Sequence, residues 1–268
     1  MILITDQLAR RLEHAQAADD AGCAEAACSL DPCSEATVVS TAGGYLTFCG
    51  PNSPLTHAIG VGMNGPVSEE ELEEIEEFFQ SRDASVTIDI TPHTDHDLRS
   101  MLCERGYTIA EFLNVLVREV RPDEPKPECP TQAQVRRIQD PRETELHSRT
   151  MLTGFMSRPD LTKEELALGR MLLLMPYSRP YLAEMHGEAA GAACLSIRDR
   201  TAHCFGDSTL PAYRNGGVHT ALICARLADA IQEGCDLALA ATQPGSVSQR
   251  NYERLGFQIA YSKLTMVL

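Results

Sequence analysis

The chain has 268 residues, a length that suits one large domain or two small ones. Hydrophobic residues make up 43% of it and charged residues 23%, which is typical of a folded globular protein. No stretch approaches the roughly 18 uninterrupted apolar residues of a membrane span, and charge appears already at Asp6. Neither a membrane helix nor a signal peptide is predicted, so we expect a cytoplasmic protein without membrane partners.

The net charge of −15 is distributed unevenly. Residues 1–130 hold 24 acidic and 8 basic side chains, whereas residues 131–268 hold 14 acidic and 15 basic ones. Binding to nucleic acid needs a basic face that neutralises phosphates, and neither half supplies one. A nucleic-acid partner is therefore not expected.

The ten cysteines do not form a metal-binding pattern, since no CxxC pair occurs. Most of them, such as Cys204 and Cys224, lie inside apolar runs where a thiol behaves as a small hydrophobic group. Cys23, Cys28 and Cys33 are spaced five apart, which spreads them around a helix. We expect reduced, structural cysteines and no metal site.

The first half predicts a mixture of helices and strands. Apolar residues repeat at helical spacing from Leu72 to Phe79, and Ser68 with Glu71 forms a capping-box pattern ahead of them. The Glu run at 69–77 is most simply a solvated helix face. In chain order we expect helix 3–28, strands 36–40, 45–49 and 57–63, helix 68–80, strand 86–90, helix 95–105, and a strand or hairpin over 107–120.

Residues 121–130 contain four prolines, which disfavour a helix and indicate an extended domain linker. The expected domains are therefore 1–120 and 131–268. In the second we expect strand 134–139, helices 142–152 and 163–174, hairpin 181–197, strand 202–207, helix 217–232, strand 236–241, helix 246–254 and final strands over 257–268.

The two halves share an element order and one short motif. An offset of 150 residues places Gly106-Tyr107-Thr108-Ile109-Ala110 on Gly256-Phe257-Gln258-Ile259-Ala260. The same offset places strand 86–90 on 236–240 and brings helix 95–105 close to helix 246–254. These matches predict two related domains.

The most informative stretch is the glycine turn at 210–222, which follows strand 202–208 and opens into an amphipathic helix. Backbone N–H groups without intrahelical partners, together with the positive end of the helix dipole, make such a turn an anion site. The simpler alternative is a tight turn in which glycine only supplies the dihedrals. A strand, a glycine turn and a helix together indicate a phosphate-bearing ligand.

Three pieces of residues 134–268 resemble the GNAT (GCN5-related) N-acetyltransferase family. Gly187-Glu188-Ala189-Ala190-Gly191 resembles its second hairpin, Arg214–His219 its acetyl-CoA signature Q/R-x-x-G-x-G/A, and Tyr252–Phe257 its closing Y-E-K-x-G-F. The resemblance implies an α/β (α+β) fold of tandem GNAT-like domains, each a mixed, mostly antiparallel sheet flanked by helices. It is clear in residues 134–268 and faint in the N-terminal half, as a degenerate copy.

The resemblance also implies roles for individual residues. Amides from Asn215 to Thr220 would hold the pyrophosphate of coenzyme A (CoA), and an amide near Leu210 would polarise the thioester carbonyl. Tyr252 would protonate the departing thiolate as general acid, although helical spacing also fits a core tyrosine. The residues expected to bind acetyl-CoA are Ser208, Thr209, Leu210, Arg214, Asn215, Gly216, Gly217, Val218, His219, Thr220 and Asn251.

A base for the acceptor amine is less well defined. Glu184, His203 and Asp207 lie on or near the strands expected to border the acceptor pocket, and the sequence does not choose among them. His219 departs from the signature, which has Gly or Ala there, and adds bulk beside the phosphates.

The N-terminal half lacks these features, because Pro66 removes an N–H and seven glutamates follow between residues 69 and 77. We expect it not to bind CoA. The resemblance implies an acetyl-CoA-dependent N-acetyltransferase that acts on an amine of a small molecule or peptide by direct attack in a ternary complex, and we expect a monomer or homodimer. The alternatives are a transferase using a longer acyl-CoA or acyl carrier, and a non-catalytic CoA-binding or interaction module.

Overall fold

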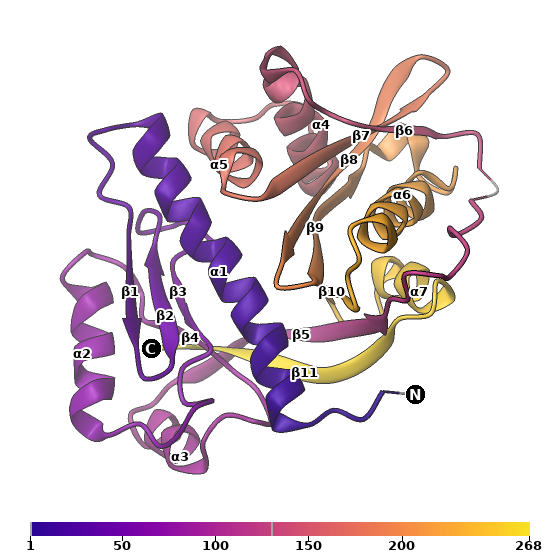
Figure 1. Cartoon of the computed structure of the whole chain (residues 1–268). Helices are drawn as coiled ribbons and strands as arrows, with labels where there is room; N and C mark the ends of the chain where they lie inside the picture. Colours follow the sequence, from indigo (N-terminus) through magenta and orange to yellow (C-terminus); the bar gives the residue numbers. More distant parts are fainter. Residues whose placement is uncertain (1, 130) are drawn as a thin grey trace. The chain divides into compact units, whose positions relative to one another are not determined.

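A computed structural model describes residues 2–129 and 131–268, which form two compact units (Figure 1). The first unit comprises the chain up to Val115 together with Ile259–Leu268, and the second comprises Leu116–Gln258. The expected boundaries at 120 and 131 thus differ from these units in two respects. Residues 116–129 group with the second unit, and the last ten residues belong to the first, where they form an inner strand of its sheet.

The first unit is built on a sheet whose strand order is β1-β2-β3-β4-β11-β5. Strand β11 runs antiparallel to β4, with Leu264 opposite Ile90. The elements are α1 (Asp6–Leu30), β1 (Thr37–Thr41), β2 (Gly44–Phe48), β3 (His57–Ile59), α2 (Glu69–Gln80), β4 (Thr87–Ile90), α3 (His96–Glu104), β5 (Thr108–Glu119) and β11 (Gln258–Val267).

Successive side chains of these strands point to opposite faces of the sheet. One face is apolar and the other is polar. Ile88 and Met266 pack with the apolar sides of α2 and α3 in one core cluster. Asp89 and Lys263 lie on the other side, where Lys263 Nζ is 3.3 Å from Asp89 Oδ2 and 3.2 Å from Glu13 Oε2 of α1. Helix α1 therefore covers the sheet through a buried ionic network.

The second unit contains a sheet of order β10-β9-β8-β7-β6, in which β9 and β10 are parallel and the other neighbours antiparallel. This confirms the expected mixed, mostly antiparallel sheet. The elements are β6 (Gln134–Arg137), 3₁₀ helix η1 (Pro141–Glu143), α4 (Thr144–Met156), α5 (Lys163–Leu174), β7 (Ser178–Met185), β8 (Glu188–Arg198), β9 (Thr201–Thr209), 3₁₀ helix η2 (Pro211–Tyr213), α6 (Val218–Gln232), β10 (Leu237–Thr242) and α7 (Val247–Arg254).

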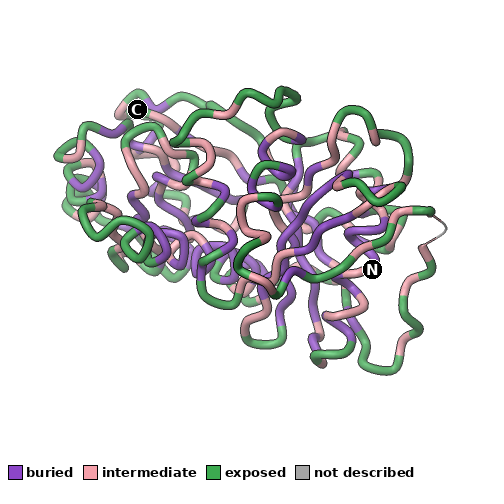
Figure 2. The backbone as a smooth tube through the Cα atoms, turned by 90° about the horizontal axis from the view of Figure 1, so that it is seen from above, coloured by how far each residue is buried: buried purple, intermediate pink, exposed green. Residues whose placement is uncertain are grey.

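Helices cover both faces of this sheet. Leu222 and Leu227 of α6 pack with Tyr252 of α7 in the larger core cluster, whereas Met151 and Leu152 of α4 pack on the other face. Buried backbone follows the strands and the inner sides of the helices, and the connecting loops are mostly exposed (Figure 2). Among the described residues, no helix is both long and apolar enough to cross a membrane.

Three expected elements differ from the structure. Strand 57–63 ends at Ile59, because Gly60 and Gly62 adopt left-handed backbone conformations with φ +75° and +71°. The final strands expected over 257–268 form one continuous strand, β11, whereas the strand alternative expected over 107–120 agrees with β5. The helix expected at 142–152 begins at Thr144, after η1, and extends to Met156.

The two segments matched by the 150-residue offset have the same local geometry. Gly106 and Gly256 both end a helix with positive φ, at +86° and +88°. The next residue then donates its N–H back into the helix, from Tyr107 to Leu102 O at 3.0 Å and from Phe257 to Tyr252 O at 3.2 Å. Each half thus turns from its last helix into its long strand in the same way.

Candidate functional site

A β-bulge directs Asp207 into the interior of the second unit. Ala192 of β8 pairs with Ser208 and Cys194 pairs with Phe205, so β9 has an extra residue between these two points. Gly206 supplies the required left-handed conformation, with φ +65°. A bulge of this kind bends the strand and redirects its side chains. Its effect here is to bring Asp207 against Arg226 of α6.

Strands β9 and β10 separate beyond the bulge. Their parallel pairing runs from Thr201–Leu237 to Cys204–Ala240, whereas β9 continues to Thr209. Residues of β9 after this pairing, together with Gln243 just after β10, line a cavity of about 840 Å³.

The glycine turn forms the rim of this cavity. Asn215 and Gly217 both have positive φ, at +63° and +79°, and α6 then begins at Val218. Unlike α2 and α5, which carry capping boxes, α6 begins without a side-chain cap. The first turn of α6 thus carries backbone N–H groups without a side-chain cap at the rim of the cavity.

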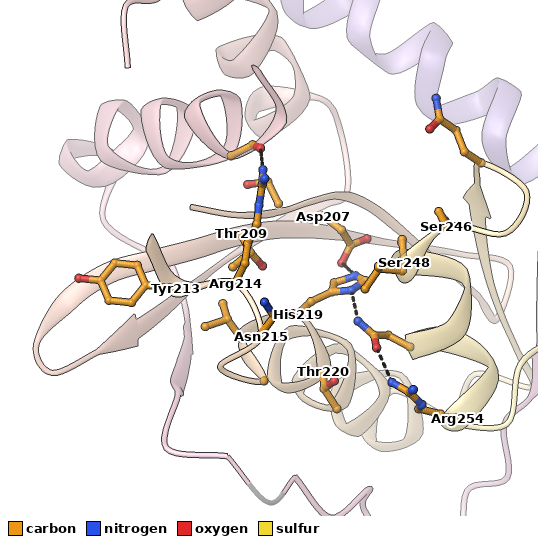
Figure 3. Close-up of a pocket in the computed structure, with 17 residues that line it drawn as sticks. Asp207, Thr209, Tyr213, Arg214, Asn215, His219, Thr220, Ser246, Ser248 and Arg254 are labelled. Carbon is orange, nitrogen blue, oxygen red and sulfur yellow. Dashed lines mark hydrogen bonds and ion pairs between the residues drawn. The ribbon is translucent and has the colours of Figure 1, made fainter. Parts of the chain in front are cut away.

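Most of the residues predicted for CoA binding line this cavity (Figure 3). The exceptions are Leu210 and Gly216. The complete lining consists of Gly154, Asp207, Ser208, Thr209, Tyr213, Arg214, Asn215, Gly217, Val218, His219, Thr220, Gln243, Ser246, Val247, Ser248, Asn251 and Arg254.

Two arginines bring positive charge to the lining. Arg214 Nη2 donates to Gly154 O at 3.0 Å and to Ser157 Oγ at 2.8 Å, so it binds the C-terminal end of α4. Arg254 Nη1 makes one exposed contact, in which it donates to Asn251 Oδ1 at 3.2 Å. Arg214 thus fixes the turn against α4, and Arg254 is the more available cation for a phosphate.

At the cavity wall, Asp207 joins the buried side chains of Arg226 and Tyr252 in one network. The Arg226 guanidinium pairs with both carboxylate oxygens of Asp207 and donates to Tyr252 Oη at 3.2 Å. The Tyr252 hydroxyl donates to Asp207 Oδ2 at 2.7 Å. Arg226 is completely buried and Tyr252 is 1% exposed, so this network belongs to the protein interior.

The network fixes the protonation of its acidic members. Burial opposes the ionised form of Asp207, but the charge of Arg226, the close approach of His219 Nε2 and the hydrogen bonds from Arg226 outweigh it and lower the Asp207 pKa. Burial raises the pKa of Tyr252 well above its ordinary value, and the adjacent Asp207 adds to this rise against the opposing charge of Arg226. Asp207 therefore stays ionised and Tyr252 keeps its proton at neutral pH.

His219 lies at the cavity surface of this network. Its Nε2 is 3.2 Å from Asp207 Oδ1, and its Nδ1 is 3.0 Å from Asn251 Nδ2. The ring also makes an edge contact with Tyr252, at 5.6 Å between centroids. The imidazole therefore points toward β9 and α7 (Figure 3).

Several expected site residues lie elsewhere. The Leu210 N–H, expected to polarise a carbonyl, donates to Ala190 O at 2.9 Å and does not face the cavity. Glu184 accepts from Arg136 Nε at 3.0 Å, and His203 lies within β9 against Phe205. Tyr252 is in the core behind Asp207. Of the three candidate bases, only Asp207 lines the cavity.

Sequence reasoning missed Gly154, Tyr213, Gln243, Ser246, Val247, Ser248 and Arg254, which also line the cavity. Ser246 caps α7 by accepting from Gln249 N at 3.1 Å, a position that its place before a helical pattern could have indicated. Gly154 had no such signal. Residue 154 has no room for a side chain, because a Cβ there would lie 2.7 Å from Ser208 Oγ.

Comparison with known proteins agrees with this geometry. Residues 141–257, which lie inside the second unit, match the family model described as Acetyltransferase (GNAT) family. This segment is thus a GNAT acetyltransferase domain. No curated protein matches the sequence.

Solved structures show a similar fold over most of the chain. A GCN5-related N-acetyltransferase from Kribbella flavida is 19% identical with a TM-score of 0.66, covering 92% of this chain and 95% of that one. A tandem GNAT protein from the clavulanic acid biosynthesis pathway is 13% identical with a TM-score of 0.59, covering 86% and 81%. A GCN5-related N-acetyltransferase from Sphaerobacter thermophilus is 15% identical with a TM-score of 0.58, covering 87% and 75%.

Proposed function

We propose that the second unit binds acetyl-CoA in the cavity between β9 and α7 and transfers the acetyl group to an amine of a small molecule or peptide. The observation that carries this proposal is the uncapped N-terminus of α6, which opens onto a cavity of about 840 Å³. That end of a helix favours an anion. The GNAT match over the same residues makes the pyrophosphate of CoA the appropriate anion.

The donor set of the cavity fits this ligand. The cavity-lining residues of the turn, Asn215 and 217–220, can supply backbone N–H donors, and Arg254 supplies a cation in the same lining. The Gly216 amide does not take part, because it donates to Tyr213 O at 3.3 Å. The edge of β9 beyond Cys204 is unpaired with β10, so its backbone can bond an extended amide chain such as pantetheine. When bound, acetyl-CoA supplies the activated acyl group, and the residues of the chain position it and the amine.

The first unit is proposed to be a degenerate GNAT-like copy that does not bind CoA. At the matching helix start, Ser68 Oγ accepts from Glu71 N at 3.1 Å, and Glu71 Oε2 accepts from Ser68 N at 2.8 Å. This capping box occupies the end of α2 that would otherwise hold an anion. The negative charge of Glu69, Glu70 and Glu71 in its first turn repels a phosphate further. A solved tandem GNAT protein with a similar fold supports the two-copy interpretation.

Calorimetric titration with CoA tests the binding part of the proposal. We expect Arg254→Ala to weaken binding about tenfold, as loss of one charge-assisted contact predicts. Arg250→Ala is the matched control, because Arg250 lies on the same helix but does not line the cavity. Absence of heat with the wild-type protein would contradict the proposal.

Release of free CoA from acetyl-CoA over a panel of primary amines tests the transferase part. We expect acetylated product with at least one amine class. Binding of CoA without any product, in the presence of active controls, would instead support a non-catalytic CoA-binding module. A rate that rises with a longer acyl chain would support the longer acyl-CoA alternative.

A further inference from the structure

A pair of cysteines joins the proline-rich segment 121–130 to helix α6 in the second unit. Cys129 of this segment is partly exposed, whereas Cys224 of α6 is 5% exposed, and both are free thiols. The Cys224 Sγ is 3.9 Å from the carbonyl oxygen of Glu128, the residue before Cys129, and it hydrogen-bonds with the Cys129 thiol. Two thiols in such contact need only a small approach to reach the S–S bond length of about 2.05 Å.

The backbone next to Cys129 is already held against α6. Thr131 N donates to Cys129 O at 2.8 Å, which closes a local turn. The Thr131 side chain lies directly on Gly217, since a Cβ at Gly217 would be only 2.4 Å from Thr131 Cγ2. The segment that carries Cys129 thus contacts the start of α6, and a covalent bond to Cys224 does not require it to dock anew.

The two thiols differ in reactivity because their surroundings differ. Burial, the charge of an ionised Cys129 and the hydrogen bond with Cys129 raise the pKa of Cys224 to about 12, against the opposing charge of Arg118. Cys224 therefore keeps its proton at neutral pH and donates to Cys129, whose sulfur is the more accessible one. The reactive form of a cysteine is an accessible thiolate. Cys129 is accordingly the thiol that attacks first.

We propose that Cys129 and Cys224 form a reversible dithiol–disulfide site whose oxidant is a small-molecule disulfide such as glutathione disulfide. The Cys129 thiolate attacks one sulfur of the oxidant, the S–S bond of the oxidant breaks, and one thiolate leaves. Cys224 then loses its proton and attacks the Cys129 sulfur of this mixed disulfide, so that the second thiolate leaves. The protein loses two electrons and two protons, and the oxidant becomes two thiols.

The first step prepares the second. Once Cys129 is in the mixed disulfide it carries no negative charge, so this contribution to the raised pKa of Cys224 disappears. The charge of Arg118 remains, and it favours the Cys224 thiolate. Arg118 is fixed in place by Glu124, with 2.9 Å from Nη1 to Oε1 and 3.1 Å from Nη2 to Oε2. Cys224 is therefore the resolving thiol, which ionises more easily after Cys129 has reacted.

The disulfide closes a long loop of the second unit. The chain between residues 129 and 224 contains strands β6 to β9 and the first part of α6. A covalent bond across it restricts the unfolded chain and so stabilises the folded unit. The same bond holds Thr131 on Gly217, in the turn that begins α6. Oxidation thus clamps the proline-rich segment to this turn, and this effect does not depend on the proposed transferase activity.

Mass spectrometry of the full-length protein tests the pairing. The protein is equilibrated with mixtures of reduced and oxidised glutathione at neutral pH, quenched with acid, alkylated and digested. We expect a cross-linked peptide pair that contains Cys129 and Cys224 and that dithiothreitol separates again. Cys224→Ala should instead accumulate the mixed disulfide of Cys129 with glutathione, and Cys129→Ser should leave Cys224 unmodified. A glutathione adduct of Cys129 that persists in the wild type, or oxidation confined to other cysteines, would overturn the proposal.

Thermal unfolding measures the effect of the bond. In the oxidised wild-type protein the second unit should unfold at a Tm at least about 5 °C above that of the reduced protein, as closure of a long loop predicts. Cys129→Ser should abolish this difference, whereas Cys103→Ser, at an exposed cysteine of α3, should retain it as the matched control. Equal Tm values for the oxidised and reduced wild type would contradict the clamp. Neither measurement involves CoA or an amine, so this proposal and the proposed function can fail independently.

Discussion

The Tyr252 hydroxyl donates a hydrogen bond of 2.7 Å to Asp207 Oδ2. This bond holds the hydroxyl inside the core cluster of the second unit, on the far side of Asp207 from the cavity that the glycine turn borders. A tyrosine at the expected place in the sequence is therefore part of a buried polar network, and that network determines which groups face a ligand.

Tyr252→Phe removes one donor from Asp207 and leaves Arg226 and His219 in place. We expect a loss of about 0.5–1.5 kcal/mol in the free energy of unfolding, the usual net value of one such hydrogen bond. The CoA affinity should change less than twofold, because Tyr252 does not line the cavity. Urea unfolding and calorimetry measure the two effects. A large loss of CoA affinity would show that the hydroxyl does reach the ligand.

Arg226→Met should be far more damaging, because it leaves Asp207 partly buried without its cation. Removing one partner of a buried ion pair costs about 3–5 kcal/mol. Arg200→Met is the matched control. The Arg200 side chain is 65% exposed and its Nη2 lies 3.8 Å from Asp236 Oδ2, so its loss should lower the free energy of unfolding by less than about 1 kcal/mol. Equal urea midpoints for the two variants would contradict the importance of the network.

Gly217→Ala tests the turn. Gly217 has φ +79°, and a Cβ there would lie 2.4 Å from Thr131 Cγ2, so the turn must shift as well as carry strain. We expect a loss of about 1–2 kcal/mol in stability from the left-handed backbone alone, and CoA binding at least about tenfold weaker. Gly234→Ala is the control, with φ +70° and open space around its Cβ. It should lose stability but keep its CoA affinity, and equal affinity losses would argue against the turn as the anion site.

The chain should bind one CoA. The end of α6 is uncapped, whereas the corresponding end of α2 is filled by its own capping box. Calorimetric titration of the full chain should therefore give about one CoA bound per protein. Gly217→Ala should weaken all of the CoA-binding heat, because it alters this single site. Two sites per chain, or half the signal surviving in that variant, would mean that the first unit also binds.

The first unit should lose stability at alkaline pH through His57. Its Nε2 is 3.1 Å from Asp20 Oδ2 and its Nδ1 is 3.5 Å from Asp89 Oδ2. Burial alone would lower the His57 pKa, but these two carboxylates raise it from 6.5 to about 10. Because the folded pKa exceeds the unfolded value, this stabilisation is fully present below pH 6.5 and is lost as the pH rises through about 10.

The size of this effect is on the order of 3–5 kcal/mol. Thermal unfolding between pH 6 and pH 10.5 measures it, and His57→Gln supplies the control. We expect the variant to be less stable at pH 6 and to show a flatter dependence on pH. A wild-type midpoint that stays constant over this range would contradict a charged His57.

Local sequence signals predicted most of the elements correctly, because the relevant physics acts over a few residues. The capping box at Ser68 and Glu71 fixes the start of α2, and the His186-Gly187 turn, with both residues at positive φ, closes the hairpin between β7 and β8. The turn before α6 was predicted for the same reason. Glycine and asparagine there tolerate the left-handed backbone that the loop requires.

Side-chain roles were predicted less well. Glu184 and His203 were candidate bases by their place on strands, but cross-strand and ring contacts hold them away from the cavity. The Leu210 amide was expected to face a ligand, but pairing with Ala190 occupies it. Such outcomes depend on partners distant in the chain, which a local pattern does not specify.

The sequence by itself determined that residues 210–222 form a glycine turn that leads from a strand into a helix, because glycine dihedrals and helix starts are local properties. Only the tertiary structure decided what surrounds that turn. The bulge at Gly206 turns Asp207 toward Arg226, Arg226 comes from the next helix, and Tyr252 comes from the last one. Their meeting buries the tyrosine and leaves His219 at the cavity, because burial and charge pairing are set by contacts between segments far apart in the chain.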